Sequence, residues 1–366
     1  MKLIDDFRDP KILLSLSKLV RRESANFSKE FNIMEVCGGH THSIMKFGLN
    51  KLVGDKINFI HGPGCPVCVM PRRRIDEAIK LSGMSEVILC TLADMMRVPG
   101  SDSSLQIERA KGADIRALYS PLDALDIAKE NPDKKVIFFA IGFETTTPMS
   151  AILVDKAINL GVKNLYFHIN HVTVPAPVSL LLSDPKNKID ALLGPSHVSV
   201  IIGTKAYTEI SQKYKKPIAI SGFEPVDIMD SVLNLVRQHK DKSFKIYNQY
   251  SRVVKECGNQ KALNLIAKYF TPCSFEWRGL GKIEQSGYEL KSEFSHIDAR
   301  KVFDCSVQSK PENRVCICGD ILKGHKKPKD CKVFAKVCTP LNPLGSCMVS
   351  SEGACAAYYK YAKGEL

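Results

Sequence analysis

Two cysteine-containing motifs have the residue types and the spacing that thiol chemistry needs. Cys37 opens the run CGGHTH at residues 37–42, and Cys65 and Cys68 form a Cys-x-x-Cys pair within the run HGPGCPVC at residues 61–68. Each run follows a short apolar segment and precedes a helical pattern, which predicts that both lie at the carboxyl ends of parallel strands. Ligands bind at that edge of a parallel sheet. The two motifs therefore mark a candidate active site.

Cys37 is a candidate thiolate. Gly38 and Gly39 allow the backbone to approach a ligand closely. A helix N-terminus with His40 and His42 beside it lowers the pKa of a thiol, which favours the reactive form of Cys37. The alternative is a half-buried cysteine in a glycine turn, with the two histidines only capping the following helix.

The pair Cys65 and Cys68 has the spacing of a dithiol that forms a disulfide. Two intervening residues let the sulfurs meet, and a helix that begins at the pair stabilises the attacking thiolate. The alternative is half of a structural zinc site, which needs two further ligands. The candidates for those ligands are Cys37, His40, His42 and His61.

A third motif, GFETTT at residues 142–147, follows a strongly apolar segment. Glu144 could move protons, and the threonine hydroxyls could hold a polar ligand. The alternative is an N-cap run in which the threonines and Glu144 stabilise the start of a helix. Other polar residues have the same two interpretations because they also follow apolar segments: His168, Asn170, His171, Ser196 and His197.

The C-terminal part of the sequence is loop-rich and contains six closely spaced cysteines: Cys316, Cys318, Cys331, Cys338, Cys347 and Cys355. A metal centre would supply the order that burial cannot supply in such a segment. The spacing differs from paired zinc knuckles and from the compact ferredoxin run, and we favour an iron–sulfur site over the zinc alternative. Nearby lysines would offset the negative charge of four thiolates on a [4Fe–4S] core: Lys323, Lys326, Lys327, Lys329, Lys332 and Lys336.

Composition narrows the class of protein. The chain has 366 residues, of which 44% are hydrophobic and 25% charged, values typical of globular proteins with two or three domains. Thirteen cysteines without an apolar leader predict a cytoplasmic protein, in which thiols serve as metal ligands or redox groups rather than as a disulfide framework. The net charge of +13 comes with no groove-reading motif, so we expect no nucleic-acid partner, and we expect no membrane span.

Short apolar runs alternate with helical patterns from about residue 31 to 239, which predicts an α/β fold with parallel sheets. The expected strands are 32–36, 57–60, 87–91, 136–141, 165–169 and 218–221, and the expected helices are 11–24, 43–53, 71–82, 122–130, 149–160, 176–182 and 226–239. A polar turn around Pro132 divides this region into α/β domains of residues 31–131 and 132–239. Residues 240–366 are expected to form a cysteine-rich domain onto which the N-terminal helical part, residues 1–30, packs.

The motifs at residues 37–42, 62–68 and 141–146, with the closing runs at 338–340 and 345–359, resemble those of the HypD family of [NiFe]-hydrogenase maturation factors. The resemblance covers nearly the whole chain. It implies two Rossmann-like α/β domains with parallel sheets. It also implies a third domain, made of the N-terminal helix and the cysteine-rich segment, that binds a [4Fe–4S] cluster.

The resemblance implies a scaffold on which the Fe(CN)2CO unit of the hydrogenase is assembled, in complex with the small chaperone HypC and with cyanide delivered by HypE. Cys37 then corresponds to the residue that binds Fe(II) carrying CN and CO, and Cys65 and Cys68 to a redox-active pair that receives electrons from the cluster. The implied cluster ligands are Cys318, Cys331, Cys338 and Cys355, with Cys316 and Cys347 as alternates. The implied hydrogen-bond or proton partners are His40, His42 and Glu144.

Two other hypotheses compete with this interpretation. One is a thiol–disulfide oxidoreductase of the ferredoxin–thioredoxin reductase kind, in which Cys37 has no part. The other is a zinc-stabilised binding module without a redox role.

Overall fold

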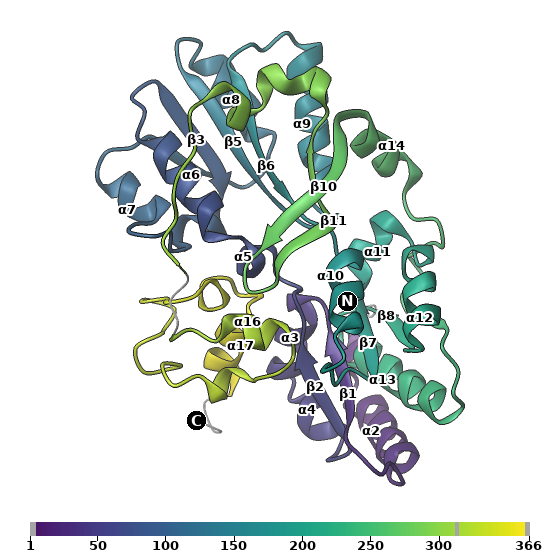
Figure 1. Cartoon of the computed structure of the whole chain (residues 1–366). Coiled ribbons are helices and arrows are strands. Elements are labelled where there is room, and N and C mark those ends of the chain that lie inside the picture. Colours follow the sequence, from purple (N-terminus) through teal and green to yellow (C-terminus); the bar gives the residue numbers. More distant parts are fainter. Residues whose placement is uncertain (1–4, 312–314, 363–366) are drawn as a thin grey trace.

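Two parallel β-sheets form the body of the molecule, and a long hairpin and the cysteine-rich segment complete it (Figure 1). The computed structural model describes residues 5–311 and 315–362. All neighbouring strands within each of the two larger sheets are parallel. The predicted α/β class with parallel sheets is confirmed.

The first sheet has five strands, in the order β2 (Ile57–His61), β1 (Phe31–Glu35), β7 (Ala191–Pro195), β8 (Ile218–Ser221) and β9 (Ile246–Asn248). Alternate residues of its central strands belong to different core clusters: Met34 and Leu192 to one, Ile33 and Leu193 to another. Both faces of the sheet are therefore covered, as parallel sheets require. The helical elements of this unit are η1 (Asp6–Arg8), α2 (Pro10–Ser24), α3 (Gly38–Lys46), α4 (Leu49–Leu52), α11 (Ser196–Ile202), η3 (Lys205–Tyr207), α12 (Thr208–Tyr214) and α13 (Pro225–Lys240).

The second sheet has four strands, in the order β4 (Ile115–Leu118), β3 (Val87–Leu92), β5 (Lys135–Gly142) and β6 (Leu165–His171). Seven of the eight residues of β5 are buried, which explains its uninterrupted apolar sequence. The helical elements around it are α5 (Pro66–Val69), α6 (Arg72–Ser82), η2 (Ala93–Arg97), α7 (Leu105–Ala110), α8 (Asp123–Glu130), α9 (Thr147–Asn159), α10 (Pro175–Ser183) and α14 (Gln260–Tyr269).

A hairpin joins the second sheet to the cysteine-rich segment. Its strands β10 (Phe270–Trp277) and β11 (Gly281–Leu290) are antiparallel, and its tip reaches α5 (Figure 1). At the tip, the N–H of Arg278 donates to the carbonyl of Val69 (2.8 Å). Gly279, with φ +77°, crosses Gly319 so closely that a Cβ on Gly279 would lie 2.5 Å from the Cα of Gly319.

The cysteine-rich segment contains little regular structure. Its elements, with those of the stretch that leads into it, are η4 (Ser292–Ile297), α15 (Ala299–Val302), α16 (Cys318–Leu322), η5 (Pro328–Asp330), η6 (Ser346–Met348) and α17 (Ala354–Tyr361). Helix α17 packs against α3, which fixes the segment beside the first sheet (Figure 1).

The two sheets do not coincide with the two α/β domains predicted for residues 31–131 and 132–239, because each sheet contains strands from both. All six expected strands form, but the division at residue 131 falls between β4 and β5, which belong to the same sheet. The chain then returns to the first sheet with β7 and β8. The periodicity of one strand does not reveal its neighbours, and the pairing of β1 with β7 over a long separation had no sequence signal. The strands β4, β7 and β9 and the hairpin were also missing from the prediction.

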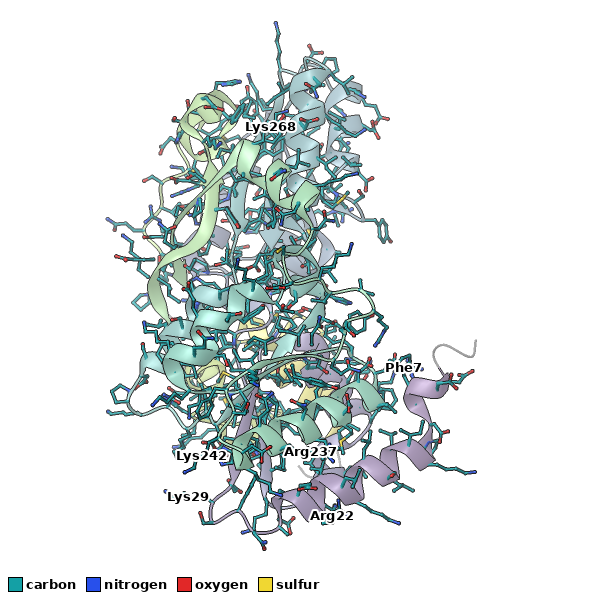
Figure 2. All side chains as sticks on the ribbon, turned by 90° about the vertical axis from the view of Figure 1, so that its right-hand side faces the viewer. Phe7, Arg22, Lys29, Arg237, Lys242 and Lys268 are labelled. Atoms are coloured by element: carbon teal, nitrogen blue, oxygen red, sulfur yellow. A yellow bond between two sulfur atoms is a disulfide. The ribbon has the colours of Figure 1, made fainter. Side chains whose placement is uncertain are left out.

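The N-terminal helix α2 also differs in its position from the prediction. It packs on α13 rather than on the cysteine-rich segment, and the two helices lie side by side in Figure 2. Val20 is fully buried in the core cluster that includes Val232 and Val236 of α13. A bond from Lys240 to Glu23 adds to this contact. The apolar side of α2 therefore covers α13, a helix that belongs to the unit of the first sheet.

The placement of α2 predicts a stability effect. Val20→Ala removes two buried methyl groups and should lower the free energy of unfolding by about 2 kcal/mol. Leu14, on the same helix, is 55% exposed, so Leu14→Ala should change it by less than about 0.5 kcal/mol. Urea unfolding of the two variants measures the difference. Equal effects would show that this helix face is not packed in the core.

Candidate thiol and metal site

The loops that follow β1 and β2 are held against each other by their backbones. Cys37 precedes α3 in an extended conformation, and its carbonyl accepts from the N–H of His40 (3.0 Å). The N–H of Gly38 donates to the carbonyl of Gly64 (3.2 Å). A Cβ on Gly64 would overlap the backbone nitrogen of Cys37, so only glycine allows this approach. The structure thus brings the two predicted cysteine motifs together.

Cys65 and Cys68 form a disulfide, and both are buried. Cys65 caps α5, with the N–H of Cys68 donating to its Sγ (3.2 Å). The observed disulfide agrees with a dithiol–disulfide pair and not with half of a zinc site, because zinc binds thiolates.

The Cys37 thiol differs from the expected thiolate. Burial raises its pKa to about 12, with further increases from the charges of Glu352 and Glu35. Hydrogen bonds from the N–H groups of Gly39 and His40 act in the opposite direction but are weaker. A metal ion deprotonates a thiol that coordinates it. Cys37 is therefore a protonated thiol in the free protein and would become a thiolate only on coordinating a metal ion.

The two histidines of the CGGHTH motif point in different directions. His40 is fully buried, and its Nε2–H lies 3.2 Å and 3.1 Å from the carbonyls of Ser221 and Gly222. Burial lowers its pKa to about 4, so it is neutral. His42 lies on another face of α3, with its Nε2 3.1 Å from the hydroxyl of Tyr361. His40 thus joins α3 to β8, whereas His42 joins α3 to α17.

A buried hydrogen-bond chain that we did not predict connects the motifs to α17. The carboxylate of Glu35 accepts from the hydroxyl of Thr41 and from His61 Nδ1, and Nε2 of His61 lies 3.2 Å from the hydroxyl of Tyr358. Burial raises the pKa of Glu35, and the bond to His61 opposes this increase. Glu35 and His61 are paired residues at the ends of β1 and β2. Glu35 lies two residues before Cys37, and His61 opens the second motif, so both positions were a signal in the sequence.

Glu144 lies at the end of β5 and is buried. Its Oε1 accepts from the N–H of Val174 (3.0 Å), whereas its Oε2 has no hydrogen-bond partner among the described residues. Burial raises the pKa of Glu144 to about 7, so this carboxyl exchanges a proton near neutral pH. The hydroxyls of Thr146 and Thr147 donate to backbone carbonyls of the same turn and support the helix start.

The polar residues at the end of β6 have partners within the core. His168 bonds to Glu77 (3.0 Å), and His171 bonds to Ser150 (2.8 Å). Glu77, His168 and Cys305 form the one group of three or more potential metal-ligand atoms within 4.8 Å of one another that the described residues contain. Glu77 also accepts from Arg73 and lies 3.2 Å from Arg300, so cations already neutralise this carboxylate.

The six cysteines of the C-terminal segment surround one small cavity. Its lining includes Cys316, Cys318, Cys331, Cys338, Cys347 and Cys355, and it is completed by Ile317, Ile321, Val333, Phe334, Gly345 and Met348. Burial and neighbouring thiols raise the pKa of Cys355, which interacts with Cys318, Cys316, Cys338 and Cys331. The thiols in this apolar cavity affect one another's pKa, and a cationic metal core would stabilise their thiolate forms.

The arrangement of the sulfurs bears on the kind of metal. A zinc ion holds four ligands at about 2.3 Å, which places their sulfurs within about 4 Å of one another. Among the described residues, no three of these cysteines form such a compact group. A polynuclear iron–sulfur core binds thiolates that are further apart. The sulfurs of the described residues are thus not arranged as the ligand set of a single zinc ion.

The cavity lies next to the disulfide. Ser346, in the element that carries Cys347, donates to the carbonyl of Cys68 (2.9 Å). Arg278, at the hairpin tip, is buried, and its charge lowers the pKa of Cys347 against the opposing effect of burial. Arg278 thus provides a buried positive charge near the thiols. The sequence did not reveal this role, because Arg278 is far from the cysteines along the chain. Of the expected lysines, Lys326, Lys329, Lys332 and Lys336 are exposed.

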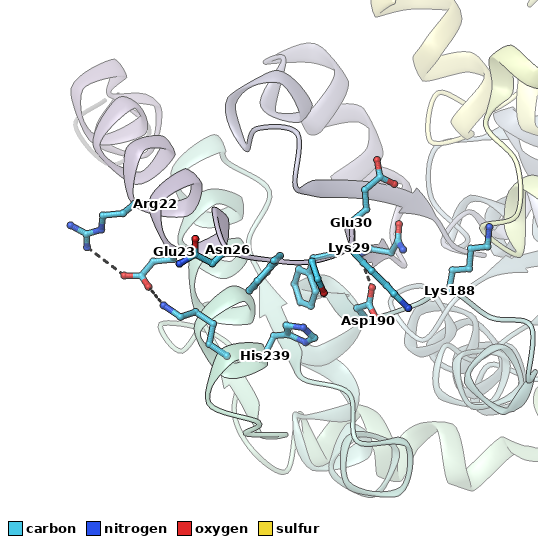
Figure 3. A pocket seen from close by; sticks show the side chains of 13 residues that line it. Arg22, Glu23, Asn26, Lys29, Glu30, Lys188, Asp190 and His239 are labelled. Carbon is cyan, nitrogen blue, oxygen red and sulfur yellow. Dashed lines mark hydrogen bonds and ion pairs between the residues drawn. The ribbon is translucent and has the colours of Figure 1, made fainter.

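A wide surface groove lies away from this site. It is lined by residues near the amino ends of β1 and β7, including Lys29, Lys188 and His239 (Figure 3). Glu23 there contacts both Arg22 and Lys240. Of the charged groups that line the groove, Arg22, Glu23 and Lys240 form ion pairs with one another, and cysteines do not line it. The candidate chemistry is therefore at the opposite ends of these strands.

The fold and the site define an α/β protein with a disulfide placed between a buried cysteine and a thiol-lined cavity, which is typical of thiol-based metal and redox proteins. No helix of the described residues is long and apolar enough to span a membrane. The chain matches the HypD family, described as "Hydrogenase formation hypA family", over residues 11–362. It belongs to the HypD family of hydrogenase maturation factors.

Curated relatives agree with this assignment. The hydrogenase maturation factor HypD of Rhodobacter capsulatus is 48% identical, with 99% of this chain and 98% of that protein covered. HypD of Azotobacter vinelandii is 46% identical over 99% of this chain and 97% of its own length. HypD of Escherichia coli K12 is 45% identical over 100% of this chain and 99% of its own length.

The raised pKa of Glu144 predicts a pH-dependent stability difference. The ordinary pKa of 4.5 rises to about 7 on folding, so the folded state binds the extra proton between these values and loses stability as the pH rises through them. Glu144→Gln should therefore match the native chain near pH 4.5 and exceed it by about 3 kcal/mol at pH 8. Urea unfolding at both pH values measures this.

The exposed Glu86 provides the control, because Glu86→Gln should give the same small difference at both pH values. A stability gain for Glu144→Gln that is independent of pH would contradict the raised pKa.

Proposed function

We propose that this chain is the scaffold and redox protein on which the Fe(CN)2CO centre of [NiFe] hydrogenases is assembled. The observation that carries the proposal is the backbone contact of Gly38 and Gly64, which holds the Cys37 loop against the Cys65–Cys68 disulfide. Membership of the HypD family supports the same role. The reducing cytoplasm is the proposed location, since eleven of the thirteen cysteines are free thiols.

Cys37 is the proposed iron ligand. A soft thiolate suits iron(II) that carries cyanide and carbonyl. Half-buried at a glycine turn, Cys37 can share the iron with a cysteine of the chaperone HypC, while HypE delivers cyanide. His40 and Glu144 are the proposed hydrogen-bond and proton groups. His42 has an indirect role, because it contacts Tyr361 of α17.

Four cysteines of the cavity are the proposed ligands of a [4Fe–4S] cluster, which when bound supplies electrons one at a time. Cys331, Cys338 and Cys355 are three of the expected four. Cys318 interacts with both Cys316 and Cys347, and Cys355 is affected by Cys318, Cys316, Cys338 and Cys331. Cys318 is the proposed fourth ligand, with Cys316 and Cys347 as alternates.

The disulfide is the proposed electron acceptor. Two electrons and two protons convert Cys65–Cys68 into two thiols, so a one-electron donor must act twice. The bond from Ser346 to the carbonyl of Cys68 holds the disulfide next to the thiol cavity. The freed thiols would support iron binding at Cys37 or reductive attachment of cyanide.

The role of Cys37 predicts the outcome of its replacement. Cys37→Ala should abolish the cyanide and carbonyl infrared bands of the complex with HypC, because the iron loses its ligand. The fold should persist, since the thiol makes no contact that supports the core cluster. Cys257→Ala, at an exposed cysteine, is the matched control and should keep the bands. Bands that persist in Cys37→Ala would refute the assignment.

The proposed cluster ligands predict iron and sulfide contents. Replacing Cys318, Cys331, Cys338 or Cys355 by serine should remove most of the acid-labile sulfide and iron from anaerobically purified protein. Cys257→Ser, at an exposed cysteine, serves as the control and should retain them. Retention of the cluster in Cys318→Ser with its loss in Cys316→Ser or Cys347→Ser would assign the fourth ligand to that alternate. Stoichiometric zinc in a colourless protein would refute the cluster.

A thiol–disulfide oxidoreductase of the ferredoxin–thioredoxin reductase kind would use the same disulfide and cavity. The family match does not favour it. Such an enzyme would reduce a protein disulfide at an unchanged rate in Cys37→Ala, whereas the scaffold loses its iron.

A further inference from the structure

Two buried hydroxyls near the start of α11 have no hydrogen-bond partner. The side chains of Ser196 and Tyr207 are 0% and 1% exposed. Neither Ser196 Oγ nor the Tyr207 hydroxyl makes a hydrogen bond within the described part of the chain. Ser199 lies near the Tyr207 hydroxyl and is not a donor to it, because its own proton goes to the carbonyl of Pro195 (2.7 Å).

Strand pairing places Ser196 beside the Cys37 loop. In the parallel register of β1 and β7, Glu35 lies opposite Leu193, and the N–H of Val36 donates to the carbonyl of Leu193 (3.2 Å). Cys37 and Ser196 follow directly after these strand ends. The two loops therefore leave the same edge of the sheet side by side.

The aromatic ring of Phe223 confirms that the two loops are close. It stacks on His40 with 4.6 Å between ring centroids and contacts His197 at 4.4 Å. His40 follows Cys37 by three residues, and His197 follows Ser196 directly. One ring thus contacts both loops.

Tyr207 lies within electrostatic reach of the same site. The charges of Glu144 and Cys37 both raise the pKa of its hydroxyl, after the larger effect of burial. Tyr207 is thus close enough to Cys37 and to Glu144 for both charges to act on its hydroxyl. Glu144 also has an oxygen without a partner.

An unpaired buried hydroxyl destabilises a folded protein, because it loses its bonds to water and gains none. Native proteins contain few such groups, and each requires an explanation. Here two hydroxyl donors and one carboxyl oxygen gather near a cysteine that the proposed function assigns to iron. A ligand with hydrogen-bond acceptors at that cysteine would satisfy the two hydroxyls.

We infer that the hydroxyls of Ser196 and Tyr207 donate hydrogen bonds to the nitrogen ends of the two cyanide ligands of the iron held by Cys37. This inference rests on the proposed function. Metal-bound cyanide carries negative charge and a lone pair on its terminal nitrogen, so it accepts hydrogen bonds well, whereas bound carbon monoxide is a poor acceptor. Two donors for two cyanides would fix the orientation of the unit and distinguish cyanide from carbon monoxide.

The test compares Tyr207→Phe and Ser196→Ala in the anaerobic complex with HypC by infrared spectroscopy. Each substitution should shift a cyanide band and leave the carbonyl band nearly in place. In the free protein, neither should lower the unfolding midpoint, because each removes an unsatisfied hydroxyl. The double variant should also retain less iron after gel filtration.

Two hydroxyls that already have partners provide matched controls. Tyr247 donates to Asp230 (2.8 Å), and Ser231 donates to the carbonyl of Asp227 (2.8 Å). Tyr247→Phe and Ser231→Ala should lower the unfolding midpoint and leave the infrared bands unchanged.

Cyanide bands that are identical in the native chain and in both variants would overturn the inference. Unfolding of the free Tyr207→Phe and Ser196→Ala variants would do so as well, because the hydroxyls would then be structural. Absence of all bands from the native complex would instead overturn the proposed function and, with it, the inference. Bands that are present in the native complex and survive in Cys37→Ala would also overturn the proposed function, because the iron would then be held by another group.

Discussion

The geometry of the site depends on the hydrogen bonds that the carboxylate of Glu35 accepts. This carboxylate binds Thr41 of α3 and His61 at the end of β2, and His61 extends the contact to Tyr358 of α17. One buried group thereby joins β1 to the adjacent helix α3, to β2 and, through His61, to α17 near the other end of the chain. Breaking a buried pair of this kind costs about 3–5 kcal/mol, because the remaining partner is left unpaired. The loops that carry Cys37 and the disulfide are thus fixed by these buried hydrogen bonds rather than by their own sequences.

The two sheets contribute unequally to the site. The first supplies Cys37, the disulfide loop and Ser196 from the carboxyl ends of β1, β2 and β7, and Tyr207 from η3. The second supplies Glu144, while the hairpin that packs on it places Arg278 near the thiol cavity. The order of parts is then Cys37, the disulfide and the thiol cavity. Each is attached to the next by a backbone hydrogen bond or by the bond from Ser346.

The sequence predicted the local structure of this molecule better than its long-range pairing. Apolar runs bounded by turn residues identified β1, β2, β3, β5, β6 and β8, and spacing alone paired Cys65 with Cys68. The neighbours of β1 could not be predicted, because every parallel strand has the same periodicity. The predicted direction of the Cys37 pKa shift was also wrong. Its expected decrease rested on the adjacent helix and histidines, whereas burial and the carboxylates of Glu352 and Glu35 come from tertiary structure.

The crossing of Gly279 and Gly319 has a consequence for how sequences of this fold can vary. Each glycine excludes a side chain from the other, since a Cβ on either would lie within 3.0 Å of the other backbone. The clash of a side chain at one position cannot be relieved by mutating the other, because no residue is smaller than glycine. The hairpin tip and the start of α16 are therefore mutually constrained. A homologue that lacks one of these glycines must carry its hairpin along a different path past the cysteines.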